Sequence, residues 1–104
     1  MIPNLISDPE PEEELRKFGL MRKYYLKEHR SGIYQAMLLS GKLKEHLLML
    51  QEQAETQFDL LVKQMAEREG VTEHLKEENQ MLWVQRMNNI RERAEEIVRA
   101  TLLQ

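Results

Sequence analysis

Two stretches of this 104-residue chain repeat apolar residues at alternating intervals of three and four, and this pattern strongly limits the possible folds. Such spacing lines the apolar side chains along one face of an α-helix, and that face must be buried against another element. The first stripe contains Leu43, Leu47, Leu50, Ala54, Phe58, Leu61 and Met65. The second contains Trp83, Met87, Ile90, Ala94, Ile97 and Thr101. We therefore expect two long amphipathic helices.

Small and polar residues mark the ends of these two helices. The first stripe is expected on a helix from about residue 42 to residue 69, between the Ser40-Gly41 break and Gly70. Thr72 is a suitable N-cap for the last helix, because its hydroxyl can accept a hydrogen bond from a free backbone N–H. The last helix is expected to reach the C-terminus, and Asn79 is a position at which it could break.

Two shorter helices are expected before the first stripe. Glu12–Glu14 favours a helix start, because carboxylates in the first turn oppose the positive end of the helix dipole. This helix is expected to end at Ser31-Gly32. A short apolar helix over residues 33–40 follows, with these residues predicted to point inward: Ile33, Ala36, Met37, Leu38 and Leu39. We predict an all-α fold, a small helical bundle with two long antiparallel helices, a basic N-terminal helix and a short connecting helix.

Charge is distributed unevenly over the first thirty residues. Residues 1–14 contain five acidic and no basic side chains, whereas residues 15–30 contain six basic side chains and one acidic side chain. Three prolines within residues 1–11 predict an extended acidic arm, and residues 12–104 are expected to form a single helical domain. The basic helix offers possible phosphate contacts at Arg16, Lys17, Arg22, Lys23, Lys27 and Arg30. A net charge of -3 argues against binding of nucleic acid by this chain alone.

The side chains that catalysis and cofactor binding require are not grouped into recognisable motifs. The chain has no cysteine, and His29, His46 and His74 lie on three different segments without metal-ligand spacing. There is no glycine-rich phosphate loop and no nucleophile placed beside a histidine. We expect no catalytic residue, cofactor or metal. No apolar run approaches the roughly 20 residues of a membrane span, so the expected location is the cytoplasm, away from any membrane.

An Asn-Asn pair in the middle of the last helix has no explanation in helix propensity. Asn is a poor helix former, because its short amide competes for backbone hydrogen bonds. A polar amide beside a helix seam can fix the register of two helices or bind a partner, and both interpretations remain open. The candidate partner-binding residues are Arg86, Asn88, Asn89 and Arg91. Apolar stripes on both long helices of a thin assembly also favour a homodimer.

Several short motifs together resemble the TnpV family, small proteins encoded on transposons and other mobile elements of Gram-positive bacteria. The resemblance covers the chain from about Gly19 to its end. Leu20 and Ser31 depart from it, because the family usually has a basic residue and a proline at these positions. The matching motifs are Tyr25-Leu26, Glu28-His29-Arg30, Leu38–Leu43, His46-Leu47, Gly70–Glu73, Trp83-Val84, Met87–Arg91 and Ala94–Val98.

The resemblance implies a biological context more than a mechanism. TnpV proteins travel with site-specific recombinases, so we expect a non-enzymatic accessory protein of a mobile element. It would act by protein–protein interaction with a recombinase or a recombinase–DNA complex. One alternative is a DNA-binding regulator or excision factor. Another alternative, which rests on the mobile-element context and the acidic charge, is an anti-CRISPR-like inhibitor of a host defence nuclease.

Overall fold

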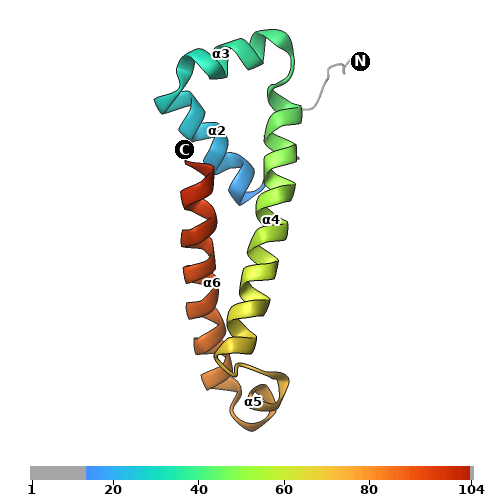
Figure 1. Cartoon of the computed structure of the whole chain (residues 1–104), viewed down its shortest axis with the longest axis vertical. Coiled ribbons are helices and arrows are strands. Elements are labelled where there is room, and N and C mark those ends of the chain that lie inside the picture. The colour runs from blue at the N-terminus through green and yellow to red at the C-terminus, as the bar shows by residue number, and fades with distance from the viewer. Residues whose placement is uncertain (1–13, 104) are drawn as a thin grey trace, which may run out of the picture. The chain divides into compact units, whose positions relative to one another are not determined.

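The computed structural model describes residues 14–103, and this part of the chain contains helices and no strand (Figure 1). The predicted all-α fold is therefore confirmed. The expected acidic arm at residues 1–11 lies outside the described residues. The helices are α2 (Lys17–His29), α3 (Ser31–Ser40), α4 (Leu43–Arg68), α5 (Glu73–Glu78) and α6 (Gln80–Leu102).

The described chain divides into two compact units, and the boundary between them lies within helix α4. The first unit contains α2, α3 and the part of α4 that ends at Gln53. The second unit begins at Ala54 and contains the rest of α4 together with α5 and α6. The domain expected over residues 12–104 thus contains two compact units.

The first unit has a small apolar core between its three helices. Met37, Leu20 and Leu48 are partly buried at the edge of this core. Gly41 has a φ of 77° and ends α3, a left-handed conformation that glycine adopts without steric cost. The turn at Gly41 leads the chain directly into α4. The buried residues of the core are Leu15, Leu26, Tyr34, Leu43 and Leu47.

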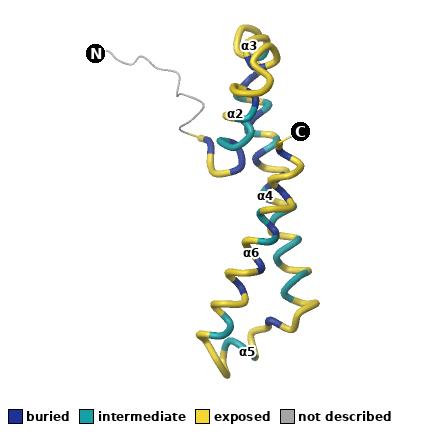
Figure 2. The backbone as a smooth tube through the Cα atoms, turned by 90° about the vertical axis from the view of Figure 1, so that its left-hand side faces the viewer, coloured by how far each residue is buried: buried dark blue, intermediate teal, exposed yellow. Residues whose placement is uncertain are grey.

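Helix α3 is much more exposed than its sequence predicted (Figure 2). It begins at Ser31, because the chain breaks at Arg30 and not at Ser31-Gly32. Tyr34 is its buried residue and Met37 is half-buried. The inward orientation predicted for the other apolar residues was wrong, because a short helix that is apolar on all sides has no polar face to show which side is buried. The exposed residues are Ile33, Ala36, Leu38 and Leu39.

The N-terminal helix also begins later than the acidic residues suggested. Glu12 and Glu13 lie outside the described residues, and α2 starts at Lys17 after a non-helical break. The buried side chain of Gln51 fills this break. Its Oε1 accepts a hydrogen bond from the Arg16 backbone N–H, and its Nε2 donates to the Glu14 carbonyl at 3.3 Å. These bonds satisfy backbone groups that a continuous helix would have paired.

In the second unit, the C-terminal half of α4 and helix α6 run in opposite directions (Figure 1). The buried residues Val71, Met87 and Ile90 form its core. Trp83 packs against this core, as its place at the head of the stripe predicted. The other partly buried residues that pack there are Val62, Met65, Ala66 and Leu75.

The local signals at the turns of the second unit were interpreted correctly. Gly70, with a φ of 71°, follows the end of α4. Thr72 is the N-cap of α5, where its hydroxyl accepts a hydrogen bond from the Leu75 N–H at 3.3 Å. Asn79 separates α5 from α6, and its Oδ1 accepts from the Leu82 N–H at 3.1 Å. The break at Asn79 is therefore a capped helix start.

The buried stripe of α6 departs from the predicted stripe in its last two turns. Val98 and Leu102 are buried, whereas the predicted Ile97 and Thr101 are exposed. Alternating steps of three and four average 3.5 residues, but a straight helix has about 3.6 residues per turn. The buried face therefore moves around α6, and the spacing of eleven residues from Met87 to Val98 follows it.

Candidate functional site

The four candidate residues on α6 are all exposed, but they do not share one face of the helix. At about 100° per residue, Asn88 and Arg91 lie only about 60° apart around the helix axis. Arg86 lies about 140° away from Arg91, on the other side of the buried stripe. The candidate site therefore divides into two parts.

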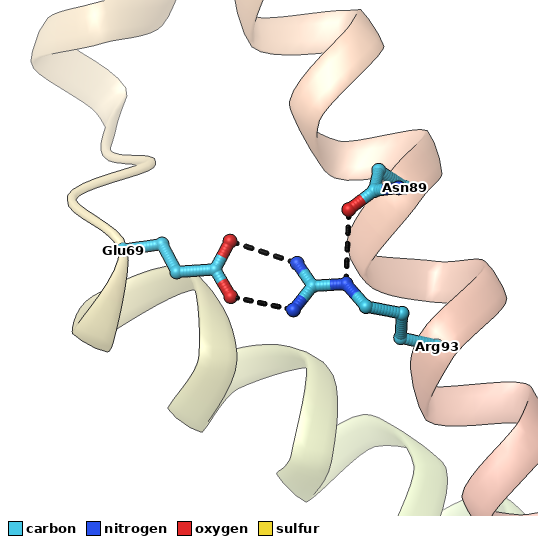
Figure 3. Close-up of polar contacts among 3 residues, drawn as sticks. All are labelled: Glu69, Asn89 and Arg93. Atoms are coloured by element: carbon cyan, nitrogen blue, oxygen red, sulfur yellow. Dashed lines mark hydrogen bonds and ion pairs between the residues drawn. The ribbon is translucent and has the colours of Figure 1, made fainter.

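Asn89 belongs to an internal contact that joins α6 to the residue after α4 (Figure 3). The Arg93 guanidinium donates to both carboxylate oxygens of Glu69 at 2.8 Å, and its Nε donates to Asn89 Oδ1 at 2.9 Å. Paired N–H bonds from one guanidinium to one carboxylate have a fixed geometry. Asn89 thus orients the guanidinium that holds Glu69.

Several positive charges surround the Glu69 carboxylate. The hydrogen bond from Arg93 lowers the pKa of the Glu69 carboxyl, and the positive charges of Arg93, Arg68 and Arg86 lower it further. The contribution of Arg86 is the smallest among these charges. Of the four candidate residues, Asn89 thus has an internal hydrogen-bond partner.

Within the described part of the chain, Asn88 and Arg91 make no comparable contact. The side chain of Asn88 makes no hydrogen bond to the residues that the structure describes, although Asn is a poor mid-helix residue. Val84 lies one turn before Asn88 and is also exposed. We call Val84, Asn88 and Arg91 the Asn88 face. It combines a small apolar centre with an amide and a guanidinium, and arginine is among the residues enriched in protein interfaces.

The basic side chains of the N-terminal helix differ in accessibility. Lys23 is buried, with only 7% of the residue exposed, and Arg22 is half-buried. Several of these cations lie near tyrosine rings: Lys27 Nζ is 6.0 Å from the Tyr34 ring centre. Such contacts hold the cations against aromatic surfaces. The exposed members of the set are Arg16, Lys17, Lys27 and Arg30.

A groove of about 640 Å³ lies between α3 and the first turns of α4. Sequence reasoning missed it, because that reasoning placed the apolar residues of α3 in the core. One available signal was the apolar character of α3 on all sides, since one small core cannot bury every side of a helix. The groove is lined by Ala36, Met37, Ser40, Lys42, Glu45, His46 and Met49.

His46 is one of three titratable side chains that line this groove, with Lys42 and Glu45. Its Nε2 is buried and has no hydrogen-bond partner among residues 14–103. Burial lowers the pKa of the His46 imidazole, and the nearby positive charge of Arg22 lowers it further. Both effects favour the neutral imidazole, so the inner wall carries no charge from His46 near neutral pH.

The described residues contain no group of three or more metal-ligating side chains that could hold a metal ion. Within the same part of the chain, no helix combines the length and apolar character needed to span a membrane.

One comparison with known proteins gives a result that covers nearly the whole chain. A family model described as "Transposon-encoded protein TnpV" matches residues 1–103. No curated protein and no solved structure matches this chain.

Proposed function

Since this chain belongs to the TnpV family of transposon-encoded proteins, we propose that it is a non-enzymatic accessory protein of a mobile element that works by binding another protein. The proposed partner is a site-specific recombinase of the same element, alone or on its DNA ends. The observation that carries this proposal is the Asn88 face, where an amide that weakens a helix is exposed without a hydrogen-bond partner among residues 14–103.

The chemistry of this face is suited to a contact with a protein surface. The Arg91 guanidinium can form paired hydrogen bonds with a carboxylate, and the Asn88 amide can donate to and accept from an exposed peptide group. The exposed Val84 adds apolar area between α6 and a partner. A few such residues at the centre of an interface supply most of the binding energy.

Binding of the purified recombinase from the same element tests this proposal. Asn88→Ala and Arg91→Ala should each weaken binding at least about tenfold, because they remove contacts at the interface centre. Arg86→Ala is the matched control, since it removes an exposed arginine from the other side of α6. If Arg86→Ala and Arg91→Ala weakened recombinase binding equally, the Asn88 face would be excluded as the binding surface. Tight binding to a host nuclease in place of the recombinase, with loss of its nuclease activity, would favour the inhibitor alternative.

A DNA-binding regulator or excision factor is the second candidate, favoured by the exposed cations of the N-terminal segment. If Arg16, Lys17, Lys27 and Arg30 contact phosphates, the logarithm of the DNA affinity should fall with the logarithm of salt concentration. The slope should be roughly -0.9 for each phosphate contact, and Lys27→Gln should reduce it by about one unit. Gel shifts at several salt concentrations measure this slope. If no DNA gel shift occurred at low salt, the DNA-binding candidate would be excluded and the protein-binding proposal would remain.

A further inference from the structure

We propose that the groove between α3 and α4 is a homodimer interface, in which Leu39 of each copy enters the groove of the other. Leu39 is 85% exposed, and Ile33 of the same helix and Met49 of the groove lining are about half exposed. Ala36 lines the groove, and Leu39 follows it by three residues, about 60° away around the axis of α3, so Leu39 stands at the edge of the groove. These apolar side chains are exposed in a chain of which 32% of the residues are charged.

The surface has the shape that a symmetric dimer requires. In a two-fold interface the same patch serves both copies, so it must contain both a projecting part and a hollow part. Leu39 projects from α3, and Met37 and Met49 line the neighbouring hollow. Methionine side chains are flexible, so they can adapt to an inserted leucine.

The charges at the groove are complementary to a second copy of the same groove. Lys42 and Glu45 line it with opposite signs and lie three residues apart in the chain. A two-fold axis reverses the order of these charges, so each Lys42 can approach the Glu45 of the other copy. A strongly charged partner such as nucleic acid would meet one repelling side chain for each attracting one. The charge pattern therefore favours a second copy over a polyanion.

The polar group inside the groove is also compatible with a closed interface. His46 lines the groove, and burial together with the charge of Arg22 favours its neutral form. Covering a neutral imidazole costs much less free energy than covering a charged one. The Nε2 atom that has no partner among the described residues can then accept or donate a hydrogen bond across the interface.

Sedimentation equilibrium of the full chain tests the proposal, and we expect a monomer–dimer equilibrium. Leu39→Glu should raise the dimer dissociation constant at least about tenfold, because it places a charge in the partner groove. The matched control is Met81→Glu, which replaces another well exposed apolar residue, 75% exposed and located in the second unit. Circular dichroism of both variants should match the wild type, since neither side chain is buried. A wild-type chain that is monomeric at roughly 100 μM would overturn the proposal. Equal weakening by Leu39→Glu and Met81→Glu would also overturn it.

A charge exchange tests the two-fold arrangement itself. Lys42→Glu and Glu45→Lys, each alone, should weaken self-association because each places like charges opposite one another. Mixing the two single variants should restore association as a heterodimer, in which one groove carries only acidic and the other only basic side chains. Failure of the mixture to associate more tightly than either variant alone would exclude the proposed pairing.

Discussion

Arg93 holds Glu69 through two hydrogen bonds of 2.8 Å each, although 24 residues separate the two in the chain. This contact ties the middle of α6 to the residue that follows α4, next to the Gly70 turn. Asn89 contributes to it by accepting from Arg93 Nε. The contact therefore gives Asn89 a partner within the second unit, and the register role that the sequence left open for the asparagine pair stays a prediction.

Replacing Arg93 with lysine should remove most of the stabilisation that this contact gives. A lysine ammonium cannot form two parallel bonds to one carboxylate, so Arg93→Lys should lower the free energy of unfolding at low salt. The difference from wild type should shrink near 1 M salt, where charges are screened beyond about 3 Å. Urea unfolding at both salt concentrations measures it. Arg99→Lys is the control, because Arg99 makes one 3.2 Å contact to Glu95 within a single helix, and an equally large effect there would contradict the prediction.

Two glycines should respond to alanine in opposite directions. A Cβ at Gly19 would lie 2.5 Å from Gln51 Oε1 and 2.8 Å from Leu15 Cδ2, so Gly19→Ala must displace the buried amide. We expect a loss of about 1–3 kcal/mol in the free energy of unfolding, because buried polar groups lose their partners. A Cβ at Gly32 would have no neighbour within 4 Å, so Gly32→Ala should stabilise exposed α3 by up to about 1 kcal/mol. Urea unfolding measures both, and the same sign for both would contradict this packing.

Short-range features of the fold could be predicted from the sequence because their causes are local. Gly41 and Gly70 adopt positive φ values, and Thr72 caps the helix that begins one residue later. These conformations depend on the residue itself and on its immediate neighbours. The long stripe on α4 could also be identified, because helical spacing is a property of one segment.

Features that depend on distant residues could not be predicted in this way. The Gln51 amide acts on backbone groups 35 and 37 residues away, and its sequence neighbours give no sign of this role. The two asparagines of α6 have the same residue type and context, but Asn89 meets Arg93 and Asn88 has no partner among the described residues. The candidate site stays a prediction, and its division into two parts follows from contacts between residues that are distant in the sequence.

The pKa of His46 predicts how stability responds to mild acid. Its pKa is lowered from 6.5 in the folded chain, so the unfolded chain binds a proton at a higher pH than the folded chain does. The free energy of unfolding should therefore fall as the pH is lowered from above 6.5 towards the folded pKa. Urea unfolding of wild type and His46→Gln at several pH values measures this. The variant should lose less stability over that window, and parallel curves would show that His46 does not contribute.

The buried face moves around α6, so truncation to alanine should lower the stability much more at one of two adjacent residues than at the other. Val98 is completely buried, so Val98→Ala should lower the free energy of unfolding by roughly 2 kcal/mol through lost apolar burial and a residual cavity. Ile97 is 44% exposed, and Ile97→Ala should change it by less than about 1 kcal/mol. Both substitutions replace a β-branched residue with alanine, so the gain in helix propensity is similar in the two variants. Urea unfolding of both variants measures the difference. A larger loss of unfolding free energy for Ile97→Ala would support the predicted stripe with steps of three and four, and it would contradict the observed shift of the buried face.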